Sequence, residues 1–143
     1  MSFDIVSAIT DNMRGVLRAR GVRFSHRSFN EAKEIPASQM PSGQISYAGE
    51  AFAGSHGERP SYSEAEFDIK VLMLEKDTEK AVREQQRWAH EIREALTVNA
   101  LNAGPLAAAK PVSRVTIAGA LAESHKDNIF SLSCKVSVRY REA

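Results

Sequence analysis

The sequence predicts an α+β fold in which a four-stranded, mainly antiparallel sheet carries two helices packed on one face. Two observations lead to this expectation. Apolar residues recur at helical spacing at the start of the chain and again in its middle. Segments in which apolar and polar residues alternate come before and after the second helical segment. The order is therefore helix, two strands, helix, two strands, with a long loop between the first two strands.

The first helix is expected over residues 3–20. Ser2 or Asp4 can cap its start, and Gly21 is well placed to end it. Its apolar residues form one stripe that is expected to face a core: Ile5, Val6, Ile9, Met13, Val16 and Leu17.

The first pair of strands is less regular. Two prolines interrupt residues 22–43, which leaves the contribution of a strand there open. A short strand is predicted over residues 44–49, and a clear one over residues 64–75. Residues 48–63 hold many glycines and other turn formers, so we expect a long loop between these two strands.

The second helix is predicted over residues 78–98, capped by Asp77 or Thr78. Trp88 falls on its inner stripe and is expected in the core. The alanine-rich residues 99–111 are expected to form a short extra turn of helix followed by a linker, and a strand is predicted over residues 114–123. One face of that strand is predicted to hold Val115, Ile117, Gly119 and Leu121.

The last strand has the clearest pattern. Apolar and polar residues alternate without fault from Phe130 to Tyr140, as expected of a strand with one buried face. A polar turn over residues 124–128 joins it to the preceding strand as a hairpin. Its polar face has serines, Lys135 and Arg139 but no acidic residue, and it is expected to face either solvent or a partner.

The bulk properties fit one domain spanning residues 1–143. The net charge is +1, and the hydrophobic and charged fractions, 43% and 26%, are ordinary for a globular chain. No stretch is apolar enough to span a bilayer, and the first residues do not resemble a signal peptide. We therefore expect a protein of a reducing cytoplasm with no membrane partner.

No pattern indicates catalysis. The four histidines have no His or Cys partner at metal-ligand spacing, and neither a phosphate-binding glycine motif nor a nucleophile elbow is present. The only cysteine, Cys134, excludes a disulfide within the chain and falls on the apolar face of the last strand, where it is expected to be a small buried side chain. We expect no enzyme activity, no cofactor and no metal site.

The order and lengths of these elements resemble the tail terminator, or tail-completion, proteins of long-tailed bacteriophages and phage-tail-like particles. The resemblance is carried by the first helix ending at Gly21, the Ile35-Pro36-Ala37 entry to the sheet, the long loop, the charged second helix and the closing hairpin. It covers nearly the whole chain and includes no diagnostic motif.

This resemblance implies a structural protein of the virion, located in the tail–neck region and assembled in the cytoplasm of a bacterial host. It implies a homo-hexameric ring that caps the head-proximal end of the tail tube and stops tube polymerisation. The implied partners are other copies of the chain, the tail tube protein, a head-completion or neck protein, and genomic DNA that passes through the lumen without sequence specificity.

Six residues are candidates for contacts in such an assembly. A glycine-rich loop that carries aromatic residues is often functional, so we predict contacts from Phe52, His56, Arg59 and Tyr62 in the long loop. Lys135 and Arg139 are the candidates on the last strand.

Three alternative functions stay open. A different head–tail connector, which binds the portal instead of the tube, would have the same type of fold. A small α+β enzyme or ligand-binding domain would need a concave pocket with converging polar groups. A nucleic-acid-binding protein is disfavoured by the near-zero net charge.

Overall fold

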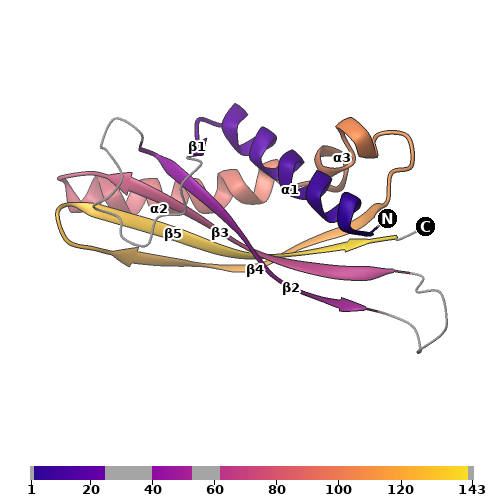
Figure 1. The fold of residues 1–143 in the computed structure, drawn as a ribbon. Coiled ribbons are helices and arrows are strands. Elements are labelled where there is room, and N and C mark those ends of the chain that lie inside the picture. The colour runs from indigo at the N-terminus through magenta and orange to yellow at the C-terminus, as the bar shows by residue number, and fades with distance from the viewer. Residues whose placement is uncertain (1, 25–39, 53–61, 142–143) are drawn as a thin grey trace.

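The protein folds as one sheet with its helices gathered on one face (Figure 1). The structure is a computed structural model that describes residues 2–24, 40–52 and 62–141. The strands lie in the order β1-β2-β3-β5-β4. Their bounds are β1 Arg23–Phe24, β2 Ser42–Phe52, β3 Ser63–Leu74, β4 Val112–Ser124 and β5 Ile129–Tyr140. The helices are α1 Ser2–Ala19, α2 Thr78–Ala95, the short α3 Val98–Leu101 and a 3-10 turn, η3, Gly104–Leu106.

The α+β class is confirmed, but the predicted sheet of four strands is wrong. A fifth strand, β1, pairs in parallel with the start of β2, so the sheet is mixed. The two strands approach closely because Gly43 has no side chain: a Cβ atom there would lie 2.5 Å from Cγ1 of Val22. A strand of two residues has no periodicity, so the alternation test could not find it.

The end of α1 has the geometry that Gly21 predicts. Gly21 has φ +101°, a value that favours glycine, and its N–H donates to the carbonyl of Arg18 at 3.0 Å. The N–H of Val22 donates to the carbonyl of Leu17 at 3.1 Å, which completes a Schellman motif. This turn directs the chain from the helix into β1.

Strand β2 is longer than predicted. The segment from Ala48 to Phe52, which we expected in the long loop, is strand and pairs with the start of β3. Ala48 is an extra residue in the ladder, a β-bulge, and Gly49 beside it has φ +135°. The glycine that marked a loop in the sequence therefore marks a bulge. The part of the predicted loop over residues 53–61 lies outside the described residues.

The predicted second helix is in fact two helices. Helix α2 ends at Ala95, and α3 begins after Thr97, whose hydroxyl oxygen accepts a hydrogen bond from the N–H of Ala100 at 3.1 Å. The described part of the chain thus has three α-helices, where the sequence predicted two. Helical spacing continued across residues 95–98, so only the capping threonine signalled the break.

The core lies between the helices and the inner face of the sheet. The stripe of α1 is confirmed through Ile9, Met13 and Leu17, which are fully buried. Trp88 is buried on α2, as predicted. The sheet contributes the alternate residues of β3 and β5, among them Phe67, Ile69, Leu132, Val136 and Tyr140.

A buried amide joins α2 to the closing hairpin. Gln85 is 6% exposed, and its Nε2 donates to the carbonyls of Glu123 and Ser131 at 3.0 and 3.1 Å. Gln85 lies among the buried residues of the helix, beside Trp88 and Ala81. The hydrogen bonds explain why a polar residue is stable there, because a buried amide left unpaired would be costly.

The closing hairpin β4–β5 is confirmed, but one detail of β4 is wrong. Val115 and Ile117 pair with the buried Val138 and Val136, while Leu121 pairs with Ser133 on the other face. A bulge between Ile117 and Gly119 adds one residue to β4 and reverses the side on which later residues lie. Leu121 is therefore 59% exposed instead of facing the core.

The start of α2 gives a direct test of the fold. Asp77 accepts hydrogen bonds from the N–H groups of Glu79 and Lys80 at 2.9 and 3.4 Å. We expect Asp77→Ala to lower the free energy of unfolding by about 1 kcal/mol, measured by urea denaturation, because two amides lose their acceptor. The control is Asp11→Ala on the exposed side of α1, which should change stability by less than about 0.5 kcal/mol. Equal effects of the two substitutions would contradict the capping role.

Candidate interaction surface

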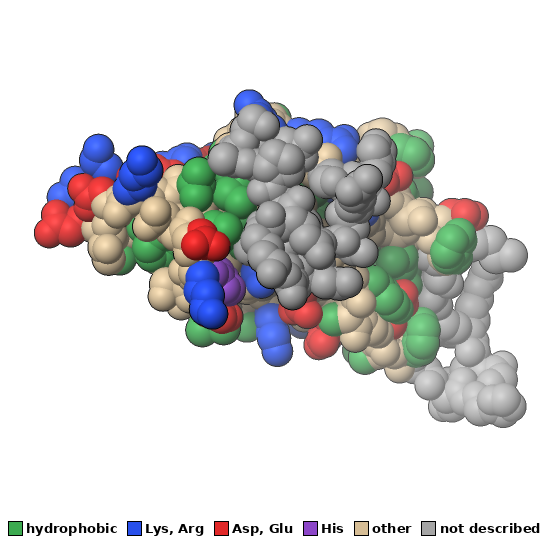
Figure 2. Space-filling model, turned by 60° about the vertical axis from the view of Figure 1, so that its left-hand side comes forward, with side chains coloured by type: hydrophobic (Ala, Val, Ile, Leu, Met, Phe, Trp, Pro, Cys, Tyr) green, Lys and Arg blue, Asp and Glu red, His purple; other side chains and the backbone are tan. Residues whose placement is uncertain are grey.

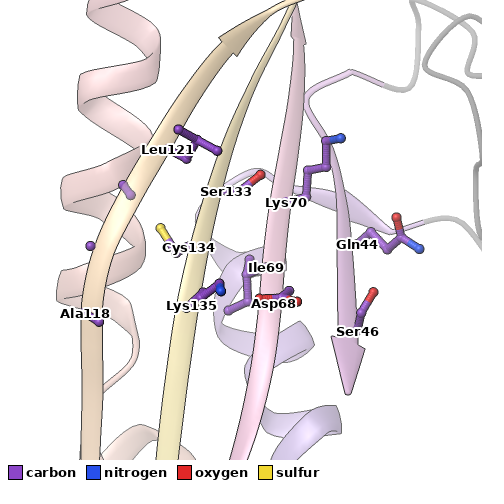
Figure 3. Close-up of a pocket in the computed structure, with 12 residues that line it drawn as sticks. Gln44, Ser46, Asp68, Ile69, Lys70, Ala118, Leu121, Ser133, Cys134 and Lys135 are labelled. Atoms are coloured by element: carbon purple, nitrogen blue, oxygen red, sulfur yellow. The ribbon is translucent and has the colours of Figure 1, made fainter. Parts of the chain in front are cut away.

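The face of the sheet opposite the helices is the first candidate surface, and Figure 3 shows part of it in close-up. We call it the open face. In the part of the chain that the structure describes, no helix lies on it. Its side chains are those that alternate with the buried residues of each strand. They are Gln44 and Ser46 on β2, Glu64, Glu66, Asp68 and Lys70 on β3, Ser133, Lys135, Ser137 and Arg139 on β5, and Arg114, Thr116 and Leu121 on β4.

Charges of opposite sign face each other across the open face. In the register of β3 and β5, Asp68 lies opposite Lys135 and Glu64 lies opposite Arg139. Glu64 also accepts a hydrogen bond from Arg114, with Nη2 and Oε1 separated by 3.0 Å. Opposite charges across neighbouring strands stabilise the pairing. The middle of the open face therefore carries both signs.

The side of the molecule shown in Figure 2 has a similar mixture. Blue and red side chains lie close together over the described residues on this side, with green ones between them. This agrees with the net charge of +1.

A hollow of about 570 Å³ lies over the middle of the open face. The small residues Ala118, Gly119 and Ala120 of β4 leave space beside Leu121, which leans over the sheet (Figure 3). These three consecutive residues have no long side chain, and the bulge between Ile117 and Gly119 lies at the same point of β4. Its polar lining comes from β2, β3 and β5: Gln44, Ser46, Asp68, Lys70, Ser133 and Lys135.

A second hollow, of about 450 Å³, lies where β4 begins and β5 ends. Four of its seven lining residues are cationic, so we call it the basic hollow. Its lining residues are Tyr62, Lys110, Pro111, Ser113, Arg114, Arg139 and Arg141. The guanidinium carbon of Arg139 lies 3.5 Å from the centre of the Tyr62 ring. This is a cation–π contact, which holds the planar guanidinium over the ring.

The structure brings together some of the residues predicted to make contacts. Tyr62 and Arg139 stack on each other. Lys135 is exposed on the open face, in the lining of the larger hollow. Phe52 is 67% exposed at the end of β2, but it pairs with Ser63 and so belongs to the face that carries the helices. His56 and Arg59 lie outside the described residues. A contact role for all six stays a prediction.

Three cationic residues of the basic hollow were missed in the sequence: Lys110, Arg114 and Arg141. A signal was available, because the hairpin was predicted correctly. In a hairpin that turns at residues 124–128, the first residues of one strand meet the last residues of the other, so Arg114 must lie near Arg139. The hairpin alone could not place Tyr62 in the basic hollow, because Tyr62 comes close to Arg139 only when β3 pairs with β5.

The polar groups form no recognisable catalytic arrangement within the described ranges. No group of three or more His, Cys, Asp or Glu residues suited to a metal ion occurs among the residues that the structure describes. Nε2 of His125 lies 2.9 Å from Oγ of Ser131, at the turn end of the closing hairpin. Burial raises the pKa of the Cys134 thiol, which favours the protonated and unreactive form.

The buried thiol leads to a prediction about reactivity. We expect Cys134 to react with a disulfide reagent at least about 100-fold more slowly in the native protein than in denaturant at pH 8. The pKa of the thiol is higher in the folded than in the unfolded chain, so the folded state holds the proton more tightly. Stability should therefore fall as the pH rises above the ordinary value of 9.0 and through the folded value. Equally fast labelling in both states would contradict the burial.

Comparison with known proteins gives no family. No protein-family model matches the sequence, and no curated protein matches it either. Within the described residues, the helices are too short or too polar to cross a membrane.

Proposed function

We propose that the protein is a structural component of a phage tail or phage-tail-like particle, of the tail terminator type, which assembles as a ring on the end of the tail tube. The observation that carries the proposal is the long β4 strand at the sheet edge. β4 spans Val112–Ser124, and within the described residues no strand pairs with its outer side. The order of helices and strands along the chain supplies the resemblance to tail terminators.

The strand directions favour contacts between copies of the chain. Each of the pairs β2–β3, β3–β5 and β5–β4 is antiparallel, so β4 runs antiparallel to β2. On the other edge, β1 covers β2 only at Ser42 and Gly43. Beyond these two residues, the outer side of β2 has no strand partner in the described chain. Neighbouring copies rotated about an axis along the strands could therefore pair β4 of one with β2 of the next in antiparallel fashion.

Such pairing would satisfy exposed backbone groups. An unpaired edge presents a row of N–H and C=O groups that readily accept another strand. Natural proteins often protect such an edge with charged side chains, but the segment from Ala118 to Ala122 has none. A contact between two different edges is heterologous, and it generates a closed ring when the rotation between copies closes. This supports an assembly of identical subunits.

The open face supplies a second surface for the proposed assembly. Its mixture of serines, small residues and paired charges suits contact with a polar partner or with water, not with a membrane. We assign the tail tube protein and a head-completion or neck protein as partners, with DNA passing through the ring without sequence specificity. The proposed role is structural, without catalysis or a cofactor.

The test is the state of assembly of the purified protein. We expect a ring in negative-stain micrographs, a mass near six times 15.7 kDa by light scattering, and arrest of tube growth when the protein is added to polymerising tube protein. Capture by portal but not by tube protein would instead indicate the alternative connector function. A protein that stays monomeric, alone and with tube protein, would overturn the proposal.

The hollow on the open face supports one alternative function. Its volume of about 570 Å³ lies in the range of small-molecule sites, and polar side chains line it. A ligand-binding domain would be monomeric and would lose its ligand when Ser133 is replaced by a bulky residue such as Phe. The ring proposal predicts assembly and no dependence on a small molecule.

A further inference from the structure

The basic hollow concentrates positive charge in one place. Four cationic side chains line it, those of Lys110, Arg114, Arg139 and Arg141. One carboxylate, that of Glu64, lies against Arg114. The whole chain has a net charge of only +1, so this end of the sheet differs strongly from the rest of the molecule.

The backbone fixes the positions of these cations. Arg114 and Arg139 are partners in the register of β4 and β5. The N–H of Arg141 donates to the carbonyl of Pro111 at 2.9 Å, and its Nη2 donates to the carbonyl of Ala109 at 2.9 Å. The charges therefore meet because the beginning of one strand and the end of the next are tied together.

The side chains are held in place but still have unused hydrogen-bond donors. The stack on Tyr62 orients the guanidinium of Arg139, and a stacked guanidinium keeps the N–H groups at its edge available. Within the described chain, neither Arg139 nor Lys110 forms an ion pair. Several cations gathered without enough counter-charge repel one another, and a bound anion would relieve that repulsion.

We propose that the basic hollow binds phosphate groups, either of a nucleic-acid backbone or of a free polyphosphate. The carboxylate of Glu64 is held by one guanidinium, which leaves Lys110, Arg139 and Arg141 without a carboxylate partner among the described residues. A ligand with one carboxylate group would bring only two oxygen atoms and one negative charge to these cations. A chain of phosphates offers more oxygens and more charge, and it suits several arginine forks placed close together. The proposal does not depend on assembly of the protein into a ring.

The first experiment uses the wild-type protein. Binding of sodium tripolyphosphate is measured by calorimetry, and binding of a fluorescent oligothymidylate by anisotropy, each over a series of salt concentrations. We expect both to bind at low salt, and the logarithm of the oligonucleotide affinity to fall against the logarithm of salt with a slope of about −0.7 for each phosphate contacted. Binding of both indicates that a nucleic-acid backbone can be the source, and binding of tripolyphosphate alone indicates a free polyphosphate. Binding of neither overturns the proposal.

The second experiment places the binding in the hollow. We expect the double variant Arg139→Gln, Arg141→Gln to weaken tripolyphosphate binding by about tenfold or more, since it removes two charge-assisted donors. The matched control is Arg83→Gln, Arg93→Gln on the exposed side of α2, which changes the net charge by the same amount. The control should weaken binding by less than about twofold, because exposed charges act weakly through salt solution. Equal loss in both variants would mean that binding is non-specific and would overturn the proposal.

Two further measurements distinguish a phosphate site from a site for an acidic peptide and from a loss of fold. Lys110→Gln, measured alone, tests the hollow without disturbing the Tyr62–Arg139 stack and should weaken binding by about threefold or more. An oligoglutamate peptide should compete poorly with tripolyphosphate. If it competes equally well, the hollow is a site for an acidic protein segment, and the assignment to phosphate is wrong. Circular dichroism and light scattering on each variant separate a loss of binding from a loss of fold or of assembly.

Discussion

Replacing Leu121 by lysine is expected to convert the proposed ring into monomers. Leu121 is 59% exposed on β4, the strand whose outer edge has no partner among the described strands. A lysine on an edge strand opposes pairing, because its charge must be desolvated when a second strand approaches. The mass measured by light scattering should fall to that of one chain, 15.7 kDa.

The matched control replaces an exposed aliphatic residue far from the edge. Val82 on α2 is 44% exposed, and Val82→Lys should leave the assembly intact. Both variants should keep the circular dichroism of the wild type, because neither residue belongs to the core. Rings that form normally from Leu121→Lys would show that β4 is not the contact between copies.

The sequence predicts the elements whose side chains face a core over many residues. The stripe of α1 and the alternation of β5 both repeat often enough to be recognised, and both are confirmed. The hairpin β4–β5 is also local, since its turn lies between its two strands. These elements follow from patterns contained within one segment of chain.

The features that were missed have causes that no local pattern contains. Strand β1 exists because Gly43, far along the chain, lets Val22 approach. The bulges at Ala48 and between Ile117 and Gly119 each shift the alternation by one residue, so the later residues were placed on the wrong face or in a loop. A bulge shifts the alternation of side chains by one residue without changing the amino-acid composition of the segment.

The candidate surfaces, too, could be predicted only in part from local sequence patterns. Lys135 and Arg139 were found because they alternate with buried residues on one strand. The acidic residues opposite them in the register, Asp68 and Glu64, depend on the order β3-β5, which places a strand from the first half of the chain beside the last strand. The cations of the basic hollow follow from the hairpin β4–β5, whereas the approach of Tyr62 also needs the pairing of β3 with β5.

Phe67→Ala is expected to cause a large loss of stability, because Phe67 is among the largest fully buried side chains. Phe67 is 1% exposed on β3, between β2 and β5, and its ring lies edge-on to Tyr47 with the centroids 6.0 Å apart. Removing a buried phenyl group costs about 3–5 kcal/mol, from lost burial and from the cavity that remains. This is a large part of the roughly 5–15 kcal/mol that stabilises a typical domain. The melting temperature should fall by about 10 °C.

The same substitution at Phe52 separates folding from assembly. Phe52 is 67% exposed at the end of β2, so Phe52→Ala should change the free energy of unfolding by less than about 1 kcal/mol. Both substitutions should be measured in the Leu121→Lys background, where association of subunits does not add to the apparent stability. In the wild-type background, a contact role for Phe52 predicts weaker assembly without a loss of fold. If Phe67→Ala is tolerated as well as Phe52→Ala, then β3 does not lie at the centre of the core.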